Sequence, residues 1–107
     1  MRLLIDTSGV SFMVTKEPEP KVDQTGQQQH RKSDGAPMWQ TQVTAMDEET
    51  GAEVIRIATA GPRPEVVLME VIHPVGLLAI PWGNNGRNGV AFRAERLDKL
   101  SENSTQS

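Results

Sequence analysis

Two kinds of side chain in this sequence can act on a ligand: tryptophan, which stacks on planar rings, and arginine, which binds phosphate. Trp82 and Arg87 lie at the base and tip of a polar loop, Gly83 to Gly89, built of Gly and Asn around that one arginine. Proteins that bind single-stranded nucleic acid combine aromatic stacking with cationic contacts to the backbone. The loop therefore predicts a binding site for single-stranded nucleic acid.

Further arginines extend this predicted site. Arg56 and Arg93 lie on predicted strands with apolar neighbours on the opposite face, so both side chains should point outward and could share one groove with Arg87. Trp39 shares its strand face with apolar residues, so we expect it chiefly in the core. The predicted nucleic-acid-binding residues are Trp82, Arg87, Arg56, Arg93 and Trp39. The alternative for each arginine is a solvated position beside an acid, where an exposed ion pair contributes little.

Catalytic, metal-binding and cofactor-binding residues are not predicted. The chain has no cysteine, which excludes disulfides, thiolate zinc sites and a cysteine nucleophile. Its two histidines, His30 and His73, are far apart and lack the spaced carboxylate and histidine ligands of a catalytic zinc site. No serine lies in a nucleophile-elbow sequence, and no glycine-rich phosphate loop occurs. We therefore expect a protein that is not an enzyme, with no metal and no cofactor.

The charge of the chain is unevenly distributed. Its formal net charge is -3 over 107 residues, which argues against a general binder of duplex DNA, because such proteins are usually basic. Acids dominate residues 17–23 and 47–53, whereas most arginines lie in the second half of the chain. A binder of single strands tolerates an acidic total if its arginines line one groove.

Short stretches of alternating or β-branched residues predict strands at 9–15, 38–46, 54–59, 75–82 and 89–97. Residues 38–59 form a predicted hairpin that turns at Gly51, with Ile55 and Ile57 inward and Arg56 outward. Residues 16–37 should be an extended edge, containing Pro18 and Pro20, followed by a long mobile loop.

This pattern predicts an all-β protein, a small five-stranded OB-fold-like barrel over residues 1–97. An SH3-like barrel is the alternative. Residues 62–74 have room for only one helical turn between the third and fourth strands. Residues 98–107 should be a disordered polar tail, with a short helical turn possible around 95–100.

Three segments, taken in order, carry a resemblance to a known family: VTKEPEPKVDQTG at 14–26, PMWQTQV at 37–43 and VGLLAIPWGNNGRNGVAFRAERL at 75–97. With these segments the chain resembles small regulatory proteins encoded by actinobacterial integrative and conjugative elements. The resemblance implies a plasmid or mobile-element setting near transfer and replication genes, but no mechanism and no catalytic residues. The general shape also resembles single-stranded DNA-binding OB-fold proteins, a likeness of fold only.

Two functions remain open from the sequence. The first is a nucleic-acid-binding accessory or regulatory protein of a mobile element, with single-stranded DNA preferred. The second is a protein-interaction adaptor that pairs through a strand edge at EPEP and through an exposed face with Met38 and Met46. In either case we expect a homo-oligomer, a dimer, because a small open barrel leaves edges to cover.

The expected location is the cytoplasm, with no membrane partner. No apolar run approaches the about 18 residues that a membrane-spanning helix needs. The opening sequence MRLLID is too short in apolar residues for the core of a signal peptide.

Overall fold

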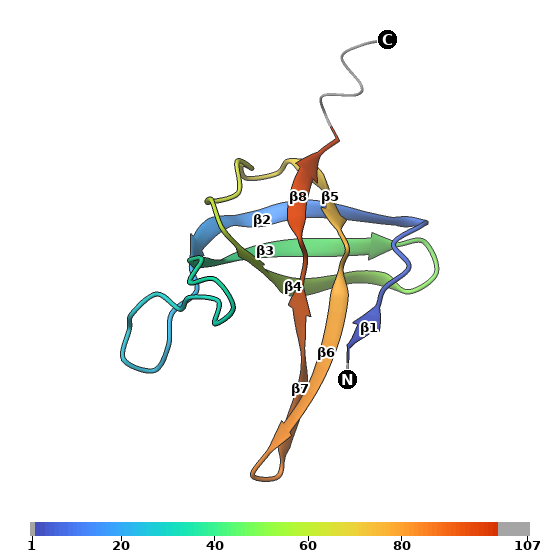
Figure 1. The fold of residues 1–107 in the computed structure, drawn as a ribbon. Coiled ribbons are helices and arrows are strands. Elements are labelled where there is room, and N and C mark those ends of the chain that lie inside the picture. The colour runs from blue at the N-terminus through green and yellow to red at the C-terminus, as the bar shows by residue number, and fades with distance from the viewer. Residues whose placement is uncertain (1, 101–107) are drawn as a thin grey trace.

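The computed structural model describes residues 2–100, which form eight strands and no helix. The protein is therefore all-β, as predicted, and one curled sheet contains all eight strands (Figure 1). No described segment makes a helix long and apolar enough to cross a membrane. The strands are β1 (Leu3–Leu4), β2 (Val10–Pro20), β3 (Met38–Asp47), β4 (Gly51–Ala60), β5 (Val71–Val75), β6 (Leu78–Asn84), β7 (Arg87–Arg93) and β8 (Arg96–Lys99).

Strands β2, β3 and β4 form an antiparallel meander. The β3–β4 hairpin pairs without interruption from Met38 opposite Ala60 to Asp47 opposite Gly51. Gly51 has a φ of 87°, a conformation that glycine adopts without steric cost. Ile57 is buried and Arg56 exposed, because side chains alternate between the two faces of a strand. The predicted hairpin and the predicted orientation of its side chains are confirmed.

Strand β2 is longer than predicted, because it continues through the two prolines. Its pairing with β3 shifts register between Val14 and Lys16, and again between Lys16 and Glu19. Such irregularities accommodate proline, which has no amide proton to donate to the ladder. Arg63 donates from Nη2 to the carbonyl oxygen of Pro18 at 2.9 Å, so part of this edge is already covered.

Residues 71–99 form a second, longer hairpin that crosses the meander (Figure 1). In its outer half β6 pairs with β7, and in its other half β5 pairs with β8. The turn consists of Asn85 and Gly86, with φ values of 53° and 78°, as a type I′ turn requires. The predicted loop from Gly83 to Gly89 is thus too long, because both of those glycines belong to paired strands.

Bends divide the arms of this hairpin. Gly76, with a φ of 65°, separates β5 from β6, while Ala94 and Glu95 separate β7 from β8. Five strands were predicted because these bends, the separate β5 and the short β1 have weak local signals. Residues 96–99 form β8, so a helical turn there is wrong, and the polar tail does not begin at 98. The remainder of the predicted disordered tail, 101–107, lies outside the described residues.

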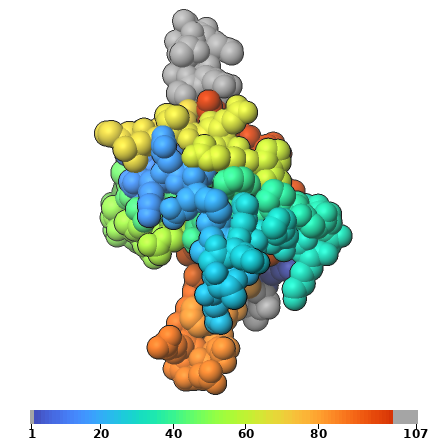
Figure 2. All heavy atoms as spheres, turned by 90° about the vertical axis from the view of Figure 1, so that its left-hand side faces the viewer, coloured from blue at the N-terminus to red at the C-terminus, as the bar shows by residue number. Residues whose placement is uncertain are grey.

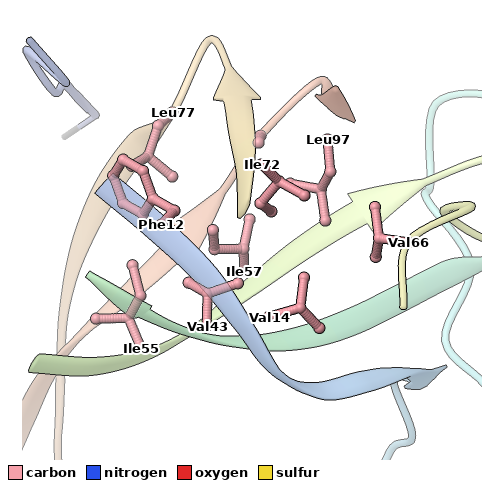
Figure 3. Packing of buried hydrophobic residues seen from close by; sticks show 10 residues of the cluster. Phe12, Val14, Val43, Ile55, Ile57, Val66, Ile72, Leu77 and Leu97 are labelled. Carbon is pink, nitrogen blue, oxygen red and sulfur yellow. The ribbon is translucent and has the colours of Figure 1, made fainter. Parts of the chain in front are cut away.

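Both halves of the long hairpin attach to the meander. Strand β5 pairs with β2 in antiparallel orientation, and β7 pairs with β4 in parallel orientation. The sheet order is β1-β6-β7-β4-β3-β2-β5-β8. The sheet curls around one apolar cluster, shown in Figure 3, of Phe12, Val14, Val43, Ile55, Ile57, Val66, Ile72, Leu77, Ala94 and Leu97. The core therefore fixes the meander and the crossing hairpin relative to each other.

The predicted loop between β2 and β3 has its own hydrogen-bonded structure. The Asp23 carboxylate accepts from the backbone amides of Thr25 and Gln27, at 2.8 and 3.1 Å. Further along, Arg31 donates from Nε and Nη2 to the two carboxylate oxygens of Asp34. Two isolated β-bridges join opposite sides of the loop. These contacts give residues 21–37 a defined path beside β3.

Candidate nucleic-acid interface

An open groove crosses the outer face of β3 and β4, between the 21–37 loop and the β6–β7 hairpin. Figure 2 shows the molecule from the side of the 21–37 loop, which is cyan and teal. The β6–β7 hairpin, in orange, projects below the loop. The groove has a volume of about 1760 Å³. Pockets for small molecules usually have about 300–1,000 Å³. A groove this large and open suits an extended polymer better than a small metabolite.

The alternation of side chains in the β3–β4 hairpin builds the floor of the groove. Thr41 and Ile57 are buried in the core, so the residues next to each of them along its strand point to the outer face. The outward set that lines the floor is Met38 and Gln40 from β3 with Val54, Arg56 and Ala58 from β4. The floor thus has apolar, amide and cationic groups side by side.

The hairpin wall carries a tryptophan fixed by a glycine. Trp82 on β6 lies opposite Gly89 on β7. A Cβ atom added to Gly89 would lie 2.7 Å from Cζ2 of Trp82, so the indole rests against the glycine α-carbon. Aromatic side chains often cover a cross-strand glycine in this way. Trp82 nevertheless keeps 48% of its surface exposed and lines the groove, where a base could stack on it.

The lining of the groove is cationic although the whole chain is acidic. The lining contains two carboxylates, those of Asp23 and Glu53. It contains six cationic side chains: Arg2, Lys21, Arg31, Lys32, Arg56 and Arg93. None of the described acids forms an ion pair with Arg56 or Arg93. The acidic total of the chain is therefore no obstacle to an anionic ligand at this site.

Two cations of the loop wall already have partners. Lys21 donates from Nζ to Oε1 of Gln29 at 2.6 Å. The hydrogen bonds from Arg31 lower the pKa of Asp34 to about 2, with a further contribution from the Ala36 amide. The same hydrogen bonds and the Asp34 charge raise the pKa of Arg31. Arg31 thus already forms an ion pair with Asp34, whereas Arg56 and Arg93 form none with a described residue.

The structure brings three of the five predicted residues together. Arg56, Trp82 and Arg93 all line the groove. Arg87 lies outside it, exposed at the tip of the hairpin opposite Asn84. Trp39 also lies outside, since it is half-buried and donates from Nε1 to the carbonyl oxygen of Gly61 at 2.8 Å.

Met38 was expected on an exposed face, and this expectation is wrong. Its side chain is only 7% exposed. The 21–37 loop folds over it: the Lys21 amide and the Gln28 side chain both donate to the Met38 carbonyl oxygen, and the Met38 amide donates to Gln29. Met38 therefore belongs to the floor of the groove and offers no free face to a partner.

Sequence reasoning did not find Gln40 or Ala58 in the site. The period of two placed Gln40 on the face opposite Trp39, which is the only local signal. Gln40 comes near Arg93 only because β3 and β7 both pair with β4, opposite Ala58. Ala58 and Arg93 are more than 30 residues apart in the chain. Nothing local to either segment reveals that contact.

Residues 2–100 contain no group of three or more histidine, aspartate or glutamate side chains placed to hold a metal ion. Comparison with family models, curated proteins and solved structures finds no match to this chain.

Proposed function

We propose that this protein binds single-stranded nucleic acid, preferably DNA, in the groove between the 21–37 loop and the β6–β7 hairpin. The observation that carries the proposal is the meeting of Arg56, Trp82 and Arg93 in one cationic groove. In this proposal Arg56 contacts a phosphate, Arg93 contacts the nucleotide bound beside it, and a base stacks on the exposed face of Trp82. Arg87 contacts the strand where it leaves the groove. Trp39 has no part in binding, because its indole N–H is already used.

The fold gives this proposal independent support. We propose that it is a variant of the OB-fold barrel, in which β5 with β6 and β7 with β8 each count as one bent strand. Strands two and three are then β3 and β4, and the loops after the first and fourth strands are 21–37 and Asn85–Gly86. OB folds bind oligonucleotides on the face of strands two and three, between these two loops. The groove occupies that position.

A single strand fits this site better than a duplex. Stacking on Trp82 requires a base whose face is free, and in a duplex the bases are stacked on one another. The role as an accessory or regulatory protein of a mobile element is supported by the sequence resemblance alone, and a cytoplasmic location belongs to the same proposal.

A titration tests this function. Fluorescently labelled single strands of about 12 nucleotides, and the matching duplexes, are titrated at about 50 and 200 mM salt. We expect tighter binding of the single strand and a log–log salt slope of about -2 to -3, since each phosphate contact on a single strand contributes about -0.7. Binding that does not depend on salt, or no binding at micromolar protein, would overturn the proposal.

A second candidate, a protein-interaction adaptor, is favoured by one observation. Strands β1 and β8 are the two ends of the sheet order, so each leaves one edge unpaired among the described residues. However, β8 carries the Arg96–Asp98 ion pair, and charged edge strands resist pairing with another chain. A dimer through these edges would appear as a doubled mass in light scattering, and a protein partner would co-purify without nucleic acid.

A further inference from the structure

We propose that the groove reads a guanine base in a slot above Ala58, between the side chains of Gln40 and Arg93. This specificity rests on the proposed binding of single-stranded nucleic acid. It assigns to Arg93 a contact with a base, whereas Arg56 contacts the backbone.

The three residues form one row across the sheet. Gln40 on β3 pairs with Ala58 on β4, and Ala58 pairs with Arg93 on β7. All three line the groove. Because neighbouring strands lie about 4.8 Å apart, the α-carbons of Gln40 and Arg93 are about 10 Å apart. The buried methyl group of Ala58 lies between them. The long side chains of Gln40 and Arg93 therefore extend farther from the sheet than Ala58 does, and they form the two walls of a slot.

The two flanking side chains are free to bind. No described residue hydrogen-bonds the Gln40 amide or the Arg93 guanidinium, although both side chains are half-buried. The neighbouring amides differ in this respect. Gln28 donates to the Met38 carbonyl, Gln29 accepts from Lys21, and Gln42 donates to Thr15. Half-buried polar groups without partners are the ones that gain most from a ligand that supplies hydrogen bonds.

Guanine matches this pair of side chains. Its Hoogsteen edge presents two acceptors, O6 and N7, which suit the two parallel donors of an arginine. Its Watson–Crick edge presents N–H donors at N1 and N2, which suit the Oε1 acceptor of Gln40. Adenine instead places an N6 donor against the arginine, and neither pyrimidine offers the O6 and N7 pair. In a single strand both edges of the base are accessible.

The position of Arg56 explains why Arg93 is left for the base. Arg56 lies in the next row of the sheet, opposite Gln42, and its side chain is exposed. An exposed guanidinium beside the slot can reach a phosphate of the same nucleotide chain. Arg93 is half-buried and lies beside the Ala58 methyl, where its guanidinium can meet the edge of a base.

The test uses thymidine oligonucleotides with one central position changed. We expect central guanine to bind wild-type protein about 5- to 50-fold tighter than adenine, cytosine or thymine, the usual discrimination of one bidentate contact. Loss of N7 in 7-deazaguanine, or of the N2 amino group in hypoxanthine, should each remove part of this preference. These comparisons use only the native chain, so no variant has to fold.

Two variants then test which side chain contacts which edge of the guanine base. Arg93→Lys keeps the charge but loses the two parallel donors, so it should abolish the difference between guanine and 7-deazaguanine and leave the salt slope unchanged. Gln40→Leu should abolish the difference between guanine and hypoxanthine. The matched control is Gln42→Leu, on the same strand face but outside the groove lining, and it should leave both differences intact.

The outcomes separate this inference from the proposed function. Salt-dependent binding with no preference for guanine would overturn the slot and leave single-strand binding in place. A guanine preference that survives both Arg93→Lys and Gln40→Leu would also overturn the slot. Failure to bind any of the oligonucleotides would overturn both proposals together.

Discussion

Trp82 lies against the α-carbon of Gly89, its cross-strand partner in the β6–β7 hairpin, and the absence of a side chain at Gly89 makes this position possible. The contact fixes the indole on the hairpin without burying it, since 48% of Trp82 stays exposed. An aromatic ring that is fixed before binding loses little conformational entropy when a base stacks on it. Gly89 is thereby a positioning residue for the proposed stacking.

Replacing Gly89 by alanine should therefore weaken binding of single-stranded DNA. The new Cβ would lie 2.7 Å from Cζ2 of Trp82, so the indole must move. We expect a loss of affinity of about tenfold, within the range that one base–aromatic stack contributes. Fluorescence anisotropy measures the affinity, and the emission of Trp82 reports the displacement.

Gly83→Ala is the matched control for this change. It lies in the same hairpin, and its added Cβ would make only ordinary contact, at 3.6 Å from the Arg87 carbonyl oxygen. Affinity should remain within about twofold of wild type, because the added methyl group displaces no neighbour and leaves the Trp82 indole in place. Equal losses in Gly83→Ala and Gly89→Ala would contradict the stacking role of Trp82.

Arg56 and Arg87 should contribute to binding over different lengths of DNA. Arg56 lines the groove floor, whereas Arg87 lies two strand residues, about 7 Å, beyond Gly89 toward the tip. Arg56→Ala should reduce the salt slope by about 0.7 for every oligonucleotide. Arg87→Ala should do so only for strands long enough to leave the groove. Measuring the salt slope of each variant with thymidine oligonucleotides of increasing length separates the two contributions. If both variants lose the same slope at every length, bound DNA does not leave the groove past Arg87.

The difference between these arginines shows what the sequence can predict and what it cannot. Alternation along 38–46 and 54–59 correctly placed Arg56 outward and Ile57 inward, because the period of a strand is a local property. Whether Arg56, Arg93 and Trp82 meet depends on the parallel pairing of β4 with β7, which joins segments distant in the chain. The types of residue that line the groove could therefore be predicted from the sequence. Which residues meet there could not.

Bends and loop contacts were the other features that local patterns did not reveal. A single strand was predicted over 75–82, beginning after Pro74, yet β5 contains Pro74, fully buried, and Gly76 forms the bend before β6. Met38 alternates like an exposed residue, but hydrogen bonds from Lys21 and Gln28 place the 21–37 loop over it. In both cases a tertiary contact overrides the local pattern.

Two buried hydroxyl groups in the core predict a stabilising substitution. Thr41 and Thr59 have Oγ1 atoms that are buried without a hydrogen-bond partner in the described structure. Thr41→Val keeps the shape of the side chain and removes the unpaired hydroxyl, so the free energy of unfolding should rise by about 1 kcal/mol. Urea denaturation followed by circular dichroism measures it. Val43→Ala, a neighbour on the same face, should instead destabilise the fold by about 2 kcal/mol.

The 21–37 loop should keep its structure to low pH. Hydrogen bonds from Thr25 and Gln27 lower the pKa of Asp23, and those from Arg31 and Ala36 lower the pKa of Asp34 to about 2. A carboxyl whose pKa is depressed in the folded state stabilises that state above its unfolded pKa of about 3.8, and this contribution is lost as the pH falls through the folded value. The Ala36 amide resonance should therefore titrate with a midpoint near pH 2, and a midpoint near 3.8 would show that the Arg31–Asp34 contact is absent in solution.

The same ion pair limits what Arg31 can contribute to the groove, which leads to the last prediction. Asp34→Asn removes the charge that neutralises Arg31 but keeps a side-chain oxygen for the Ala36 amide. Single-stranded DNA should then bind about two- to fivefold tighter, with a steeper salt slope, because one more cation is available for a phosphate. The double variant Arg31→Gln with Asp34→Asn is the control and should return affinity to the wild-type level or below. Unchanged affinity in Asp34→Asn would show that bound DNA does not pass along this wall of the groove.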